Sequence, residues 1–128
     1  MSVIIGYVPT PEGQAALQYA VKECLLRECD LVVVQSSRRS DATDDFAEDL
    51  EAARSDLAGA GLSVDTRTGT EGNEPAEDLI EAAEGGAADL IIIGLRRRTP
   101  IGKLILGSNA QRILLDAPCP VIAVKAEA

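Results

Sequence analysis

The sequence predicts an α/β fold in which five parallel strands, numbered along the chain, form one sheet in the order 3-2-1-4-5 with helices on both faces. Short apolar runs alternate with stretches whose apolar residues recur at helical spacing, and this alternation is typical of parallel sheets joined by right-handed helical crossovers. Hydrophobic residues make up 46% of the chain but aromatic residues only 2%, so aliphatic side chains must build the core. Buried parallel strands favour this composition. The length of 128 residues suits one domain, residues 1–128.

The first half of the chain predicts two strands and two helices. Residues 3–8 are a short apolar run, and Thr10-Pro11-Glu12 then supplies a capping hydroxyl, a proline at the first helical position and an acid in the first turn. The inward stripe of this helix is Leu17, Ala20, Val21, Cys24 and Leu25. Residues 31–34 predict the second strand. A second helix, with a candidate cap near Ser40, is indicated by Phe46, Leu50, Ala53 and Leu57.

A third strand and a third helix follow. Residues 62–68 alternate apolar and polar side chains, which predicts a half-exposed strand at a sheet edge. Asn73 can cap the next helix, which Gly85-Gly86 ends. The inward residues of this helix are Leu79, Ile80 and Ala83.

The last part of the chain predicts a central strand, a helix and a closing strand. Residues 90–93 are apolar throughout, so this strand is central, and it ends at Gly94. A fourth helix begins near Ser108 and buries Ile113 and Leu114. Residues 121–124 form the fifth strand and complete a Rossmann/flavodoxin-like arrangement. In such sheets, ligands bind beyond the carboxyl ends of the strands, where the strand order reverses.

Composition and charge exclude several classes of function. The net charge of −9 argues against a nucleic acid or an anionic membrane as partner. No apolar run approaches the roughly 18 residues of a membrane span, and no signal peptide is visible, so we expect a cytoplasmic protein. The three cysteines, Cys24, Cys29 and Cys119, form no C-x-x-C pair, which argues against a disulfide scaffold or a zinc site. We interpret Cys24 and Cys119 as small buried side chains.

The chain has no histidine, which removes the commonest general base and the usual metal-ligating imidazole. No nucleophile with a partnering base and no metal-ligand cluster is evident in the sequence. We therefore expect no fast catalysis, and at most a slow nucleotide hydrolysis through a positioned water.

The loop after the fourth strand concentrates positive charge in this acidic chain. It carries Arg96, Arg97, Arg98 and Lys103, and it closes on Gly107-Ser108-Asn109, where the fourth helix begins. The N–H groups of Ser108 and Asn109 should point out of the helix start, where the helix dipole favours anions. The arginines can add charge-assisted hydrogen bonds. The pattern predicts a phosphate site.

This architecture and loop resemble the universal stress protein family over essentially the whole chain. Nucleotide-binding members carry G-x-x-G, nine residues and then G-[ST] after the fourth strand. Gly94 matches the first position, and Gly107-Ser108 matches the closing pair at the expected spacing. The segment APCPVIAVK, residues 117–125, also looks like the family's closing strand.

The resemblance implies a ligand and a partner. ATP or AMP would bind in the crevice beyond the first and fourth strands, with no metal other than a nucleotide-associated Mg²⁺. The adenine and ribose side would be formed by Val8, Pro9, Thr10 and Ser36. Thr10 is interpreted first as a helix cap. A second copy of the chain would pair through the last strand, formed by Val121, Ile122, Ala123 and Val124.

Two positions depart from the family pattern. Arg97 replaces the second motif glycine, and Pro9 stands where ATP-binding members carry an aspartate. These departures leave two hypotheses. The first is a stress-response protein that senses an adenine nucleotide or another phosphorylated ligand. The second is a dimeric protein-interaction module in which both substitutions have disabled the nucleotide site. A flavodoxin-like electron carrier fits the same fold, but the scarcity of aromatic residues disfavours it.

Overall fold

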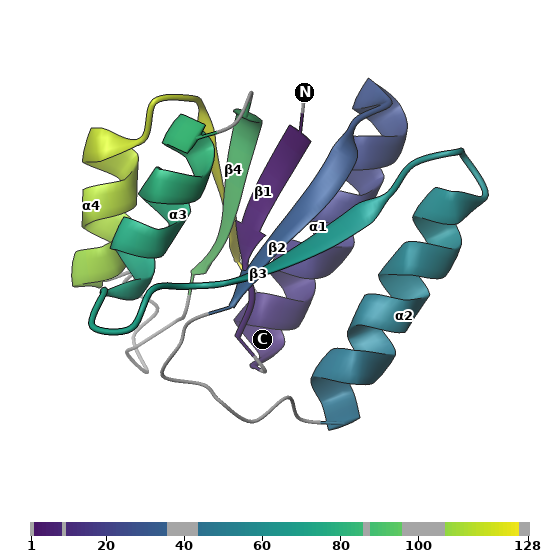
Figure 1. Cartoon of the computed structure of the whole chain (residues 1–128), viewed down its shortest axis with the longest axis horizontal. Helices are drawn as coiled ribbons and strands as arrows, with labels where there is room; N and C mark the ends of the chain where they lie inside the picture. The colour runs from purple at the N-terminus through teal and green to yellow at the C-terminus, as the bar shows by residue number, and fades with distance from the viewer. Residues whose placement is uncertain (1, 9, 36–43, 86–87, 96–106, 126–128) are drawn as a thin grey trace.

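Strands and helices alternate along the chain in the computed structural model, which describes residues 2–8, 10–35, 44–85, 88–95 and 107–125 (Figure 1). The strands are β1 (Ser2–Gly6), β2 (Asp30–Gln35), β3 (Val64–Thr68), β4 (Ala88–Leu95) and β5 (Val121–Lys125). The helices are α1 (Pro11–Arg27), α2 (Asp44–Ala58), α3 (Pro75–Gly85) and α4 (Ser108–Asp116). Each strand pair is parallel, and the sheet order is β3-β2-β1-β4-β5, which confirms the predicted fold and topology.

The sheet separates two apolar layers. Helices α1 and α2 cover one face, and α3 and α4 lie on the other (Figure 1). Because successive side chains of a strand point to opposite faces, Leu90 and Ile92 of β4 pack toward α1 and α2, whereas Ile91 and Ile93 pack toward α3 and α4. All four are buried, so the prediction of a central strand is confirmed. Strand β3 lies at the sheet edge, as its alternating sequence predicted.

Strand β4 differs from its predicted end. Gly94 does not terminate it but pairs with Val124 inside the ladder, and Leu95 pairs with Lys125. The extension depends on β5, which continues far enough to supply partners for both residues. Strand β1 is shorter than predicted and ends at Gly6, although the Tyr7 N–H still donates to the Val34 carbonyl at 3.0 Å.

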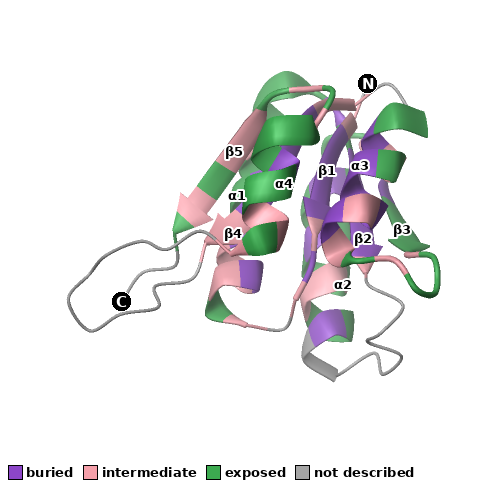
Figure 2. Ribbon diagram, turned by 90° about the vertical axis from the view of Figure 1, so that its left-hand side faces the viewer, coloured by how far each residue is buried: buried purple, intermediate pink, exposed green. Residues whose placement is uncertain are grey.

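The residues predicted to face inward in α2 and α3 are confirmed. In α1 and α4 the predicted inward face is too wide, because each includes one leucine that is exposed. Leu25 of α1 is 42% exposed and Leu114 of α4 is 43% exposed, whereas both were expected to face inward. Helix α4 packs beside α3 and turns much of its surface to solvent (Figure 2). Ile113 is its one buried residue. None of the described helices is both long enough and apolar enough to cross a membrane.

Candidate functional site

A cavity of about 500 Å³ lies at the carboxyl ends of β1, β2 and β4, within the size range of small-molecule sites. Its strand-side wall consists of Gly6, Tyr7, Val8, Val34, Ile93 and Gly94. Its helix-side wall consists of Pro75, Asp78, Leu79, Asn109, Ala110 and Ile113, which come from α3 and α4. The cavity therefore occupies the point where the strand order reverses, as the sequence predicted for a ligand site.

Gly94 has a packing role that does not depend on any ligand. A Cβ atom at this position would overlap the backbone carbonyl of Glu12, in the first turn of α1. The absence of a side chain therefore lets the N-terminus of α1 approach β4. Gly94 also lines the cavity, so the glycine serves both the helix packing and the cavity wall.

The turn after β1 is fixed by the start of α1. Thr10 is the N-cap of this helix, and its hydroxyl oxygen accepts a hydrogen bond from the Gly13 N–H at 3.2 Å, which confirms the predicted cap. The Thr10 N–H donates to the Val8 carbonyl at 2.9 Å. A Cβ at Gly13 would overlap that same carbonyl. These contacts hold Val8 at the cavity wall.

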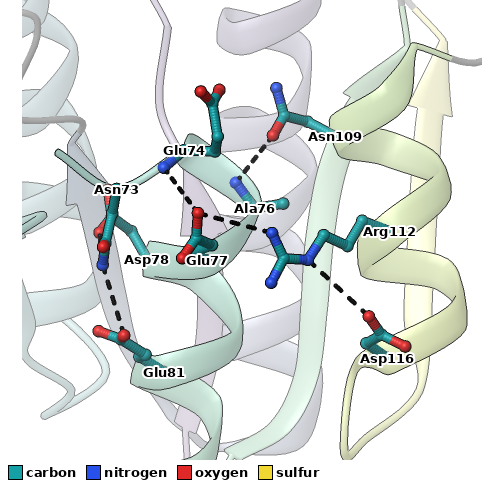
Figure 3. Close-up of polar contacts among 9 residues, drawn as sticks. All are labelled: Asn73, Glu74, Ala76, Glu77, Asp78, Glu81, Asn109, Arg112 and Asp116. Atoms are coloured by element: carbon teal, nitrogen blue, oxygen red, sulfur yellow. Dashed lines mark hydrogen bonds and ion pairs between the residues drawn. The ribbon is translucent and has the colours of Figure 1, made fainter.

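Helix α4 begins as predicted, but its first residues have different roles. Gly107 is the N-cap and makes no side-chain capping bond, and Ser108 is exposed. Asn109 lines the cavity, and its Oδ1 accepts a hydrogen bond from the Ala76 N–H at 3.1 Å (Figure 3). Asn109 thus caps the first turn of α3 from a neighbouring helix. This corrects the prediction that Asn73 caps α3.

Further polar contacts link the first turn of α3 to the middle of α4 (Figure 3). Glu77 Oε1 accepts a hydrogen bond from the Glu74 N–H at 3.2 Å and pairs with Arg112 of α4 at 3.5 Å. Arg112 also pairs with Asp116 at 3.8 Å. Since helix N-termini carry partial positive charge and α4 has no acid in its first turn, the α4 start is the side of the cavity suited to an anion, whereas the first turn of α3 carries Glu77 and Asp78.

Asp78 of α3 is a site residue that the sequence analysis missed. Its side chain is only 5% exposed, and no other charged residue is buried in the part of the chain that the structure describes. Its Oδ1 accepts hydrogen bonds from the Thr70 N–H at 3.1 Å and from Asn73 Nδ2 at 3.2 Å. Along the sequence Asp78 looks like an ordinary first-turn acid, because its burial depends on the preceding loop folding over it.

The cavity brings together only part of the predicted site. Val8, Gly94 and Asn109 line it, whereas Thr10 and Ser108 lie at the adjacent helix starts. Pro9, Ser36, Arg96, Arg97, Arg98 and Lys103 lie outside the described residues. In the part of the chain that the structure describes, no cluster of three potential metal-ligating side chains occurs.

The thiols are poorly suited to nucleophilic chemistry. Burial, assisted by the nearby Cys29, Asp30 and Glu23, raises the pKa of Cys24 to about 12. Burial and a 3.5 Å hydrogen bond to Asp89 raise the pKa of Cys29 as well. The interpretation of Cys24 as a packed small side chain is confirmed, whereas Cys119 is only half-buried.

Comparisons with known proteins agree with the fold and the sequence motifs. The model of the universal stress protein family matches residues 1–125. A universal stress protein of Mycolicibacterium smegmatis is 34% identical over 126 residues, which cover 96% of each chain. The structure of a universal stress protein from Archaeoglobus fulgidus superposes with a TM-score of 0.73 at 30% identity and 98% coverage of each chain. A universal stress protein structure from Archaeoglobus fulgidus in complex with dAMP gives a TM-score of 0.69 at 26% identity, again with 98% coverage of each chain.

Proposed function

This chain belongs to the universal stress protein family, and we propose that it binds an adenine nucleotide, ATP or AMP, or another phosphorylated ligand in the cavity described above. The observation that carries the proposal is the position of this cavity at the carboxyl ends of β1, β2 and β4, between two helix starts. The dAMP complex of a relative with the same fold, 26% identical, supports a nucleotide as the ligand.

The layout of the cavity suggests how a nucleotide would lie. The phosphate would face the start of α4, where the N–H groups of Ser108 and Asn109 and the preceding basic loop converge in sequence. The base would point toward the end of β2, which contributes Val34. The carboxyl ends of β4 and β2 lie on either side of β1, so they are about 10 Å apart at ordinary strand spacing. A nucleoside monophosphate can span this distance.

The chemistry of the chain fits a sensor better than an enzyme. The sequence has no histidine, and the pKa values of Cys24 and Cys29 are raised by burial rather than lowered as in reactive thiols. Binding would therefore act as the signal, and hydrolysis would be slow at most.

Isothermal titration with ATP, AMP and inorganic phosphate, at low and physiological salt, tests the proposal directly. We expect ATP and AMP to bind with micromolar or tighter affinity. Ala110→Leu, which narrows the cavity, should weaken binding, whereas Ala47→Leu on the exposed side of α2 should not. No binding heat, no thermal shift and no co-purified nucleotide in native mass spectra would reject it.

Strand β5 supports a second proposal, that the chain forms a homodimer through its last strand. Within the described sheet β5 pairs with β4 on one side, and its Val121, Ile122 and Val124 are only half-buried, with Ala123 exposed. An apolar strand edge of this kind favours association unless something covers it. If nucleotides do not bind, this dimer becomes the basis of a protein-interaction module.

Light scattering tests the dimer. We expect twice the chain mass for the wild type and the monomer mass for Ala123→Glu, because two carboxylates would meet across the pairing strands. Ala47→Glu on α2 serves as the control of equal charge. A wild-type chain that remains monomeric at high concentration would exclude the dimer.

A further inference from the structure

The side-chain amide of Asn109 is held at the cavity wall by its oxygen. Oδ1 accepts a hydrogen bond from the Ala76 N–H at 3.1 Å. Ala76 is fully buried and is the second residue of α3, where a backbone N–H has no partner within its own helix. An unpaired buried donor would destabilise the fold, so this N–H needs an acceptor from outside α3. Asn109 supplies that acceptor from the second residue of α4.

The fixed oxygen determines where the amide nitrogen lies. If the amide were turned over, Nδ2 would face the Ala76 N–H and two donors would meet, so the hydrogen bond settles the orientation. Figure 3 shows Nδ2 on the side of the amide that is turned away from Ala76. Nδ2 donates to no other residue that the structure describes. The partly buried Asn109 therefore brings an oriented donor group to the cavity wall.

The place of Asn109 determines which part of a nucleotide this donor can meet. Asn109 lies in the first turn of α4, which carries no acid, whereas Val34 lines the cavity at the end of β2. If the phosphate lies at the start of α4 and the base at the end of β2, Nδ2 is beside the phosphate. Phosphate oxygens accept hydrogen bonds, and a bond to an ionised acceptor is stronger than one between neutral groups.

We propose that Asn109 donates a hydrogen bond from Nδ2 to the phosphate of the ligand and so favours a nucleotide over the free nucleoside. The inference rests on the proposed nucleotide function and deepens it, because it assigns a side chain to the phosphate. Asn109 then has two roles, as the cap of α3 and as a ligand donor. An aspartate would also cap a helix start but would offer no donor, so Asn109→Asp separates the two roles.

Isothermal titration with AMP and adenosine, together with thermal melts, tests the assignment. The wild type should bind AMP more tightly than adenosine. We expect the AMP affinity to fall by about tenfold in Asn109→Ala, which removes the donor, and by more in Asn109→Asp, whose carboxylate also repels the phosphate. The adenosine affinity of Asn109→Asp should stay within about twofold of the wild type, since the lost bond involves only the phosphate. Asn109→Asp keeps the acceptor for Ala76, so its melting temperature should fall less than that of Asn109→Ala.

Gln111→Glu is the matched control, because it makes the same change from amide to carboxylate at an exposed position of the same turn. Its AMP affinity should stay within about threefold of the wild type, since solvent and salt screen the added charge.

Three results would overturn the inference. If only Asn109→Asp weakens AMP binding and Asn109→Ala does not, the effect is charge repulsion and Nδ2 is not a donor to the phosphate. If Asn109→Asp weakens AMP and adenosine equally, Asn109 only shapes the cavity. Equal wild-type affinities for AMP and adenosine would overturn this inference alone, whereas no binding of either would overturn the proposed function as well. If Asn109→Ala does not fold, Asn109→Asp and Gln111→Glu still decide the question.

Discussion

Gly94→Ala tests the claim that the cavity wall is built by close approach of α1 to β4. The new methyl group would overlap the Glu12 carbonyl oxygen, which belongs to the helix backbone and cannot rotate away as a side chain could. Overpacking of this kind typically costs about 1–3 kcal/mol. The backbone at Gly94 is not in the left-handed region, so alanine also gains about 0.4–1 kcal/mol by restricting the unfolded chain. We expect a net loss of about 1–2 kcal/mol in the free energy of unfolding.

Urea denaturation and thermal unfolding measure this loss. For a chain of 128 residues, a loss of 1 kcal/mol lowers the melting temperature by about 4 °C, so we expect a decrease of about 4–8 °C. The urea midpoint should fall while the slope of the transition stays unchanged. Gly59→Ala is the control, because the nearest atom to its added methyl would be 3.7 Å away. If Gly94→Ala behaves like Gly59→Ala, the packing argument is refuted.

Asn109→Ala should lower the free energy of unfolding by about 0.5–2 kcal/mol because α3 loses its cap, and thermal melts should show no comparable loss for the exposed Ser108→Ala. Cys24 should resist a thiol reagent at pH 8, because its raised pKa keeps it protonated, and Cys24→Ala should leave the native thiol count unchanged. Since its thiol ionises more readily in the unfolded chain, stability should fall as the pH rises above about 9, less steeply in Cys24→Ala. The double variant Arg96→Ala with Arg98→Ala should weaken ATP binding and reduce its salt dependence, as measured by titration. If the affinity is unchanged, the basic loop is not part of the site.

The sheet and its order could be predicted because they depend on patterns within each segment. Residues 90–93 are apolar at every position, and only a strand covered on both faces explains this economically. Thr10 and Pro11 likewise define a helix start from adjacent residues alone. Such local signals need no knowledge of the rest of the fold.

The errors arose where a residue's role depends on distant parts of the chain. The predicted end of β4 at Gly94 was wrong because strand length is set by pairing with β5. Leu114 is exposed because periodicity gives the direction of a helix stripe but not how much of the sheet lies beneath it. Asn73 was predicted to cap α3, but Asn109, 33 residues from Ala76, supplies that contact from α4.

The candidate site divides in the same way. The turn residue Val8 and the motif residues Gly94 and Asn109 were predicted from sequence order and do line the cavity. Asp78 could not be predicted, since its burial requires the loop after β3 to supply the Thr70 N–H and the Asn73 amide. A first-turn acid of a helix is usually exposed, and nothing adjacent in the sequence distinguishes this one.

Titration of the isotopically labelled protein with AMP, followed by amide NMR, tests the central claim most directly, because it reports where the ligand binds. We predict that the largest shift changes fall on residues at the carboxyl ends of β1, β2 and β4 and at the start of α4, including Val8, Val34, Gly94 and Asn109. Changes confined to β5 or to the exposed side of α2, or no changes at millimolar AMP, would contradict the assignment of this cavity as the nucleotide site.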